Sequence, residues 1–202
     1  MQDKVKLSIL ILTHNRPILF QRCIGSALEN RPSGVEIIVN NDSQDIKEIP
    51  GAKYFYEKHD DLSLVYKFLF DNAKGEFVYF LEDDDYLMKN FYKVVMGIKQ
   101  NTIFRYFPEK NIKLYYEYFK DEGKFKTEFQ LGQIIFKKET VKNFPIGNRL
   151  DNDFLLYLEA NANEKFIKNE ACLYVQTLDG KDNISYPLLN RDVRFVGDGC
   201  GI

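Results

Sequence analysis

The residues best suited to chemistry are four consecutive acidic side chains, Glu82 to Asp85, which directly follow an apolar run. That run, Phe77 to Leu81, is aromatic and β-branched, so it predicts a buried strand. Neighbouring carboxylates raise one another's pKa, which makes their packing at a strand end electrostatically costly. A divalent cation would offset that cost, because hard oxygen ligands suit Mg²⁺ or Mn²⁺. The pattern therefore indicates a metal site, with a solvated acidic turn as the alternative.

Two further polar clusters follow predicted strands in the same way. Thr13 to Arg16 comes after the apolar run Leu7 to Leu12, and Asn40 to Ser43 comes after Val35 to Val39. In open α/β sheets, ligands bind beyond the carboxyl ends of the strands. Three independent clusters on one edge predict a pocket there. A metal held by one or two carboxylates usually takes its other ligands from water and substrate phosphates.

The elements that would position these clusters alternate along the first two-thirds of the chain. A third strand is predicted over Lys53 to Glu57, and helices over Ile18 to Leu28, Leu62 to Ala73 and Phe91 to Lys99. Pro17 suits a first helical turn, and Lys74-Gly75 predicts a glycine cap. This order predicts an α/β fold with a mostly parallel sheet and helices on both faces.

The last third of the sequence is less regular. Short helices are predicted over Lys138 to Asn143 and Asp153 to Ala160, and the last residues, 191–202, predict a flexible tail. Strands are predicted over Ile103 to Phe107, Ile112 to Tyr118, Gln133 to Phe136, Phe166 to Lys168 and Leu173 to Gln176.

Bulk composition narrows the class of protein. The 202 residues are 45% hydrophobic and 15% aromatic, which is a globular composition with room for one domain. The net charge of −2 creates no field toward nucleic acid or anionic membrane. Cys23, Cys172 and Cys200 have neither metal nor disulfide spacing, which favours a reducing, cytoplasmic location. No signal peptide and no membrane-spanning run is predicted.

Three blocks of the first half together resemble the family 2 glycosyltransferases, which have the nucleotide-diphospho-sugar transferase (GT-A) fold. They are SILILTHNRP (residues 8–17), VEIIVNNDSQD (35–45) and AKGEFVYFLEDDDYL (73–87). More weakly, Gly132 to Glu139 resembles the family's acceptor-side strand and helix, and Asn152-Asp153-Phe154 its base motif. The resemblance implies a single domain over 1–202, with a nucleotide-sugar-binding half (1–100), an acceptor-side half (101–190) and a tail (191–202).

The resemblance assigns donor-binding roles to the polar clusters. Thr13, His14, Asn15 and Arg16 would hold the nucleobase, with His14 where a Tyr is common. Asp42 would hydrogen-bond the base edge, and Asn41 stands where the family often has an Asp. Asp83 would contact the ribose or donor sugar. Outside these clusters, Lys67 could reach a phosphate, although most lysines on such helices face solvent.

For the metal, the resemblance implies Mn²⁺ or Mg²⁺ held by Asp84, with Asp85 as a supporting ligand. Glu82 departs from the usual Asp, so the acidic pair reads either as Glu82 with Asp84 or as Asp83 with Asp85. Asp153 would be the general base that activates an acceptor hydroxyl and inverts the anomeric centre. Its alternative role is that of a carboxylate stabilising a helix start.

The expected activity is metal-dependent transfer of sugar from a nucleotide sugar, chiefly a UDP-sugar, to a glycan or envelope saccharide. An alternative acceptor is a hydroxymethylated base in DNA, because the middle of the chain is rich in lysine: Lys110, Lys113, Lys120, Lys124, Lys126, Lys137, Lys138 and Lys142. Acidic residues dilute this basic bias. A nucleotidyltransferase and a non-catalytic nucleotide-sugar-binding module are further alternatives. The sequence leaves the oligomeric state open.

Overall fold

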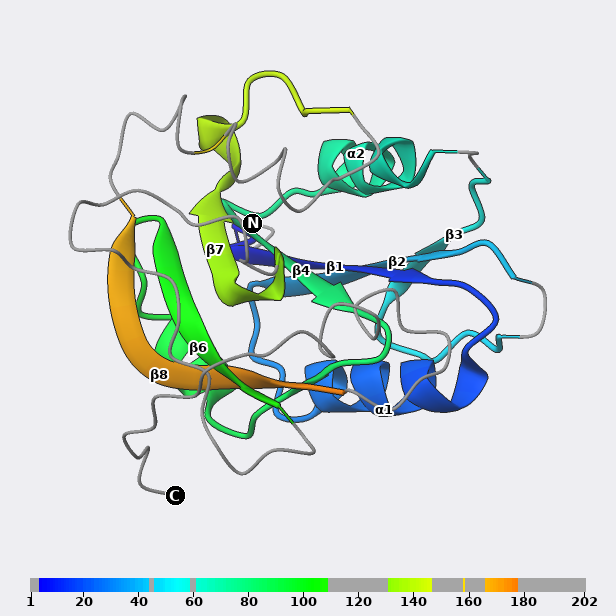
Figure 1. The fold of residues 1–202 in the computed structure, drawn as a ribbon, viewed down its shortest axis with the longest axis horizontal. Coiled ribbons are helices and arrows are strands. Elements are labelled where there is room, and N and C mark those ends of the chain that lie inside the picture. Colours follow the sequence, from blue (N-terminus) through cyan, green and yellow to red (C-terminus); the bar gives the residue numbers. More distant parts are fainter. Residues whose placement is uncertain are drawn as a thin grey trace, which may run out of the picture.

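The first half of the molecule is a regular alternation of strands and helices (Figure 1). A computed structural model describes residues 4–43, 46–58, 61–108, 131–146, 158 and 166–177. Its first elements are β1 (Leu7–Thr13), α1 (Pro17–Leu28), β2 (Val35–Asn41), β3 (Lys53–Phe55), α2 (Leu62–Asn72) and β4 (Phe77–Glu82). Each lies where the sequence pattern predicts it, with ends that differ by one or two residues.

One sheet joins the two halves of the sequence. The strand order is β3-β2-β1-β4-β7-β6-β8-β5. Strands β3, β2, β1 and β4 run parallel, and β7 (Ile134–Lys137) pairs antiparallel to β4. Beyond it lie β6 (Thr102–Pro108), β8 (Ile167–Gln176) and the two-residue β5 (Tyr86–Leu87). The sheet is thus mixed, with a parallel block that carries the three predicted clusters.

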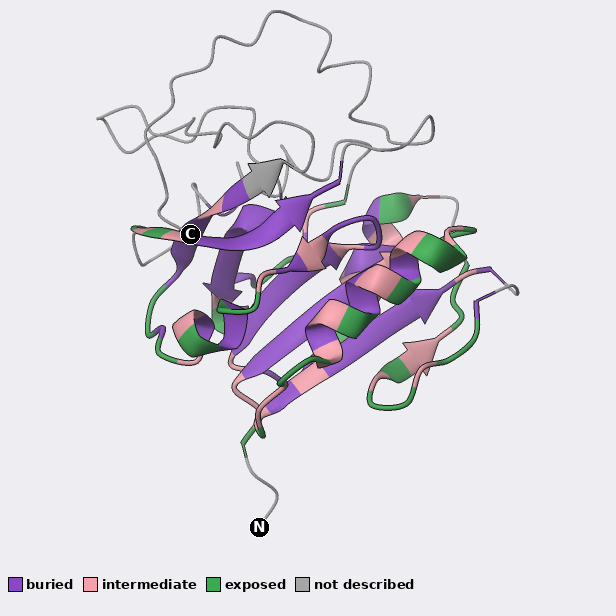
Figure 2. Ribbon diagram, turned by 90° about the horizontal axis from the view of Figure 1, so that it is seen from below, coloured by how far each residue is buried: buried purple, intermediate pink, exposed green. Residues whose placement is uncertain are grey.

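Helices cover both faces of the parallel block, as predicted. Alternate residues of β1 point to opposite faces, so Ile9 packs with α1 and α3 (Phe91–Val95), whereas Leu10 packs with α2. Strands β1, β2 and β4 are almost entirely buried, and Figure 2 shows them behind a helix whose outer side is exposed. Because both faces of these strands are covered, they read in the sequence as continuous apolar runs. The predicted α/β fold class is confirmed.

Gly75 has a different role from the predicted helix cap. Helix α2 ends at Asn72, and the capping residue Ala73 has an extended backbone (φ −69°, ψ 138°). Gly75 instead packs against β1, where its amide donates to Ser8 Oγ over 2.8 Å. A Cβ at this position would lie 2.5 Å from the Ser8 amide nitrogen. The glycine is therefore required by close approach of two backbones.

Other elements differ from the predictions in length. Helix α3 stops at Val95 instead of Lys99, close to Gly97, which is a poor helix former. The two strands predicted between Phe166 and Gln176 form the single strand β8. Residues Lys138–Thr140 form only a 3₁₀ turn, and Leu131–Gln133 form another before β7. The strand predicted over 112–118 and all but one residue of the helix over 153–160 lie outside the described residues.

No helix within the described ranges is long and apolar enough to cross a bilayer.

Candidate functional site

The three predicted clusters meet at one edge of the sheet. In the parallel pairing, Thr13 lies opposite Asn41, and Leu12 lies opposite Glu82, so the ends of β1, β2 and β4 are level. The acidic turn, which we define as residues 82–85, begins at the last residue of β4. It closes with a hydrogen bond of 3.1 Å from the Asp85 amide to the Glu82 carbonyl. The three clusters therefore lie together at one edge of the sheet, as the sequence predicts.

The carboxylates of the acidic turn are buried in spite of their charge. Asp83 and Asp84 are each 6% exposed, and Asp85 is 2% exposed. Burial raises the pKa of Asp83 and of Asp84, and the nearby Arg16 guanidinium opposes that rise in both. Burial also raises the pKa of Asp85 well above its ordinary range, and the neighbouring Asp84 adds to this rise. Such a group of carboxylates needs cations beside it to stay ionised.

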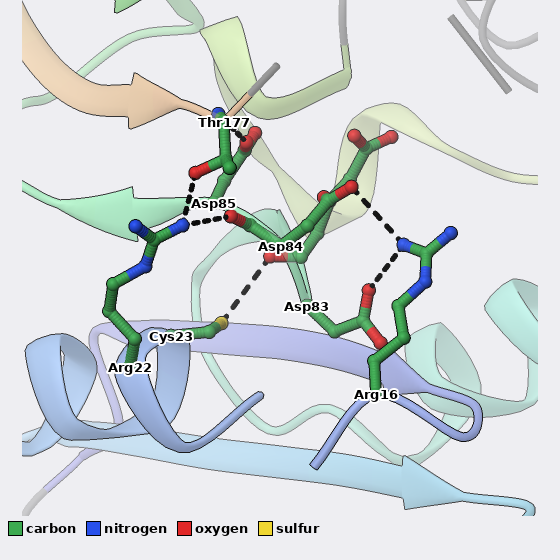
Figure 3. A network of polar contacts seen from close by, with 8 residues as sticks. Arg16, Arg22, Cys23, Asp83, Asp84, Asp85 and Thr177 are labelled. Carbon is green, nitrogen blue, oxygen red and sulfur yellow. Dashed lines mark hydrogen bonds and ion pairs between the residues drawn. The ribbon is translucent and has the colours of Figure 1, made fainter. Parts of the chain in front are cut away.

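Arg16 is one of these cations. Its Nη1 donates to Asp83 Oδ1 over 3.0 Å and to Asp84 Oδ2 over 3.1 Å, so a single nitrogen bridges two carboxylates (Figure 3). Arg16 immediately precedes α1 and follows Asn15, whose backbone is left-handed (φ 51°). Asparagine tolerates that conformation better than most residues. The tight loop after β1 thus places the guanidinium over the acidic turn.

Arg22 is the second cation, and nothing in the sequence pattern distinguishes it from other helical arginines. From α1 it donates to the Asp84 backbone carbonyl over 3.0 Å and to the Thr177 hydroxyl. Its guanidinium also lies 4.6 Å from the centre of the Tyr86 ring. The Thr177 amide donates to Asp85 Oδ1 over 2.9 Å. These contacts fix the acidic turn between α1 and the end of β8 (Figure 3).

The donor set fits a divalent cation. Glu82, Asp84 and Asp85 each offer a carboxylate oxygen, and these atoms lie within 4.8 Å of one another. Hard carboxylate oxygens are suitable ligands for Mg²⁺ or Mn²⁺. The group contains both predicted metal ligands, Asp84 and Asp85, and adds Glu82. Asp83 does not belong to it, so the structure groups Glu82 with Asp84 rather than Asp83 with Asp85.

A second polar group lies at the ends of β1 and β2. His14 Nδ1 lies 2.6 Å from Asp42 Oδ1, and Asn15 Nδ2 lies 3.0 Å from His14 Nε2. His14 is exposed, whereas Asp42 is about three-quarters buried. Asn41 turns inward: its Nδ2 donates to the Ile46 carbonyl over 3.0 Å, and its Oδ1 accepts from the Ser43 amide. Asn41 therefore shapes the loop that presents Asp42, and Thr13, which pairs with Asn41, is buried.

The structure does not bring every predicted residue to this edge. Lys67 lies on α2, where its ammonium pairs with Asp71 one turn later at 2.5 Å, and no described contact joins it to the acidic turn. Asp153 lies outside the described residues, as do five of the eight lysines behind the DNA alternative. Lys138, which is described, donates to the carbonyls of Asp71 and Ala73 and lies 5.2 Å from the Phe70 ring centre. The Lys138 ammonium thus makes contacts within the protein itself.

Comparison with known proteins establishes the family. A sequence model of a protein family, described as "Glycosyl transferase family 2", matches residues 8–131, which is more than half of the sequence. The chain belongs to glycosyl transferase family 2. A curated relative is the uncharacterized glycosyltransferase MG060 of Mycoplasma genitalium, which is 32% identical over 101 residues. That match covers 42% of this chain and 34% of MG060.

Solved structures of S. aureus TarS share the fold. TarS 1–349 superposes with a TM-score of 0.65 at 16% identity, covering 85% of this chain and 60% of that one. TarS 1–349 in complex with UDP-GlcNAc gives a TM-score of 0.65 at 17% identity, covering 85% and 58%. The GT-A fold predicted from the resemblance is confirmed. The chain spans about a third of MG060 and less than two thirds of TarS 1–349.

Proposed function

We propose that this protein is a metal-dependent, inverting glycosyltransferase that uses a UDP-sugar. The observation that carries the proposal is the acidic turn, in which Glu82, Asp84 and Asp85 offer oxygens within 4.8 Å of one another at the carboxyl edge of the parallel strands. That edge is where open α/β sheets bind nucleotides. The similar fold of TarS, solved in complex with UDP-GlcNAc, favours a UDP-sugar as the donor.

The base would bind at the ends of β1 and β2. Asp42 keeps a second carboxylate oxygen besides the one that lies against His14 Nδ1. A carboxylate accepts hydrogen bonds, and the N3–H of uracil is a donor. His14 holds Asp42 at this edge, and its exposed ring offers a face to the base. Discrimination among UDP-, GDP- and dTDP-sugars would then depend on this pair and on the surrounding loop.

The diphosphate would lie between the base site and the acidic turn. Glu82, Asp84 and Asp85 would hold the metal, whose chemistry is to neutralise the charge that develops on the leaving diphosphate. Arg22 and the Thr177 amide hold Asp84 and Asp85 in place through the contacts described above. Fixed ligands need no reorganisation during the reaction, and this preorganisation is the main contribution of the protein at such a site.

The acceptor side of the proposal rests on the sequence. Asp153 would take the proton of an acceptor hydroxyl, so that the hydroxyl attacks from the face opposite the diphosphate and inverts the anomeric centre. We propose a glycan or envelope saccharide as the acceptor. No described contact favours DNA. The cytoplasmic location stays a prediction.

Calorimetric titration with UDP tests the metal-dependent donor site. We expect binding with Mn²⁺ and little or none with a chelator. Asp84→Asn should weaken UDP binding in Mn²⁺ by about 10–100-fold, the usual effect of disturbing a metal site. Asp71→Asn is the matched control, because Asp71 is exposed and pairs with Lys67 on α2, outside the acidic turn. Equal UDP affinity of the unmodified protein in Mn²⁺ and in chelator, or of the unmodified protein and Asp84→Asn in Mn²⁺, would contradict the proposal.

A further inference from the structure

Asp84 contacts one positive charge and is a candidate ligand for a second. One of its oxygens accepts from Arg16 Nη1 at 3.1 Å, and its carboxylate also belongs to the group that fits a divalent cation. The Asp84 and Asp83 side chains are 9% and 8% exposed, and the Arg16 side chain is 26% exposed. Two cations sharing one carboxylate in so little water repel each other, because solvent screens buried charges weakly.

Formal charges at the acidic turn show what each cation contributes. The turn carries four carboxylates, and the two guanidiniums of Arg16 and Arg22 reduce this charge of −4 to −2. One divalent cation would balance the remainder. A nucleotide diphosphate then brings further negative charge into the same place and needs another positive partner. Arg16 is suited to this, because its planar guanidinium can pair with phosphate as well as with carboxylate.

We propose that Arg16 is an exchangeable counter-cation of the acidic turn. Without ligand it neutralises Asp83 and Asp84. With metal and nucleotide bound, it gives up Asp84 to the metal and pairs with the diphosphate. Arg16 therefore weakens binding of the metal alone and strengthens binding of the nucleotide with the metal. This coupling makes the metal enter mainly together with the donor. The inference rests on the proposed function, since it assigns Arg16 to the diphosphate of that donor.

Arg16 lies in a suitable place for both roles. It precedes the first residue of α1, and Pro17 occupies the first helical turn. The N-terminus of a helix favours anions, because its first amides have no partners within the helix. A phosphate close to this end would meet the positive end of the twelve-residue α1 as well as the Arg16 guanidinium.

The test measures binding of Mn²⁺ alone and of UDP in saturating Mn²⁺. Free Mn²⁺ is counted from its electron paramagnetic resonance signal, and UDP binding is followed by calorimetry. In Arg16→Gln we expect Mn²⁺ alone to bind about 10-fold more tightly and UDP with Mn²⁺ to bind about 10-fold more weakly. Arg16→Lys keeps the charge, so Mn²⁺ affinity should stay close to that of the unmodified protein. Arg31→Gln is the matched control, because Arg31 follows α1 at its other end and contacts the Gly51 carbonyl.

Arg16→Gln should tighten Mn²⁺ binding and weaken UDP binding, and these opposite effects distinguish an exchangeable counter-cation from a residue that only positions Asp84. If Arg16→Gln weakens both kinds of binding, Arg16 merely positions Asp84 and the proposal is wrong. Unchanged Mn²⁺ affinity would overturn the competition between the two cations. If the unmodified protein binds Mn²⁺ but no UDP, the proposed function fails, whereas tighter Mn²⁺ binding by Arg16→Gln still supports the competition. Arg16→Met is a second neutral variant, and circular dichroism verifies that each variant is folded.

Discussion

The backbone amide of Thr177 donates a hydrogen bond of 2.9 Å to Oδ1 of Asp85, which lies 92 positions earlier in the sequence. Asp85 belongs to the turn after β4, and Thr177 follows the last residue of β8. Next to this bond, β5 pairs with β8, with Tyr86 opposite Val175. Removing a partner from a buried carboxylate leaves its charge poorly compensated. The end of β8 is therefore part of the candidate site.

Arg22 should control how well the acidic turn binds metal. In Arg22→Met the contacts to the Asp84 carbonyl and the Thr177 hydroxyl are lost, and we expect Mn²⁺ affinity to fall by about 10-fold. Arg22→Lys should restore part of that affinity, because an ammonium can still reach one acceptor. Gln21→Met is the control on the exposed side of the helix. Mn²⁺ affinity within twofold of the unmodified protein would show that Arg22 has no such role.

Asp42 should act on the base and not on the phosphates. We expect Asp42→Ala to weaken binding of UDP with Mn²⁺ by roughly 10–100-fold, the scale of a hydrogen bond to a charged group. Binding of pyrophosphate with Mn²⁺ should be unchanged, because it contains no base. Parallel calorimetric titrations with the two ligands measure the difference. An equal loss for both ligands would mean that Asp42 is not a base contact.

Asp153 should matter for the transfer step alone. Asp153→Asn should keep UDP affinity and lower turnover by a factor of about 10² or more, the usual contribution of a general base. Turnover can be followed by hydrolysis of the donor sugar until an acceptor is found. Asp151→Asn is the neighbouring control. A large loss of melting temperature with near-normal turnover would instead identify Asp153 as a helix-start carboxylate.

The ionised carboxylate of Asp85 should lower the free energy of unfolding at neutral pH when no metal is present. Because its pKa in the folded protein is raised from 3.8, the folded state holds the proton more tightly than the unfolded state does. Stability is therefore lost as pH rises from about 4 through the raised pKa. Asp85→Asn should increase stability at pH 7 by about 1 kcal/mol, or roughly 2–4 °C in melting temperature.

The same variant separates stability from binding. The gain from Asp85→Asn should disappear well below pH 3.8, where the carboxyl is protonated in both the folded and the unfolded state. Mn²⁺ should raise the melting temperature of the unmodified protein and leave the variant nearly unchanged, because only binding to the folded state stabilises it. Thermal melts at about pH 3 and at about pH 7, with and without Mn²⁺, measure these effects. A variant less stable than the unmodified protein at pH 7 would refute the expected direction of the effect.

Alanine substitutions at Gly75 and Gly25 test whether the close approach of two backbone segments requires a glycine at position 75. Gly75→Ala brings a Cβ within 2.5 Å of the Ser8 amide nitrogen, and we expect a loss of about 1–3 kcal/mol. Gly25 lies within α1, where an added Cβ meets nothing within 4 Å. Gly25→Ala should therefore stabilise the protein by about 0.5–1 kcal/mol. Urea unfolding of both variants gives the two values, and equal effects would contradict the close-approach role of Gly75.

The sequence was most informative where side-chain pattern and backbone pairing agree. Strands β1, β2 and β4 are buried on both faces, so apolar runs predicted them, and the polar residues after each run predicted the edge of the sheet that forms the candidate site. Strand β8 was harder to predict, because Asn169 and Glu170 interrupt its apolar pattern. It continues through them by pairing with β6, with irregular register around Arg105. Arg22 and Thr177 carried no local signal, since their roles come from contacts between distant segments.

The place of β8 in the sheet has a consequence for biosynthesis. Strand β5, next to the acidic turn, pairs with β8 alone among the described strands. A nascent chain that has released β1, β2 and β4 from the ribosome can form the parallel block, but Asp85 gains its amide partner only after residue 177 has emerged. Assembly of the acidic turn is therefore completed only after the parallel block can form. Until then, a growing chain can have much of its core while the Asp85 carboxylate still lacks this partner.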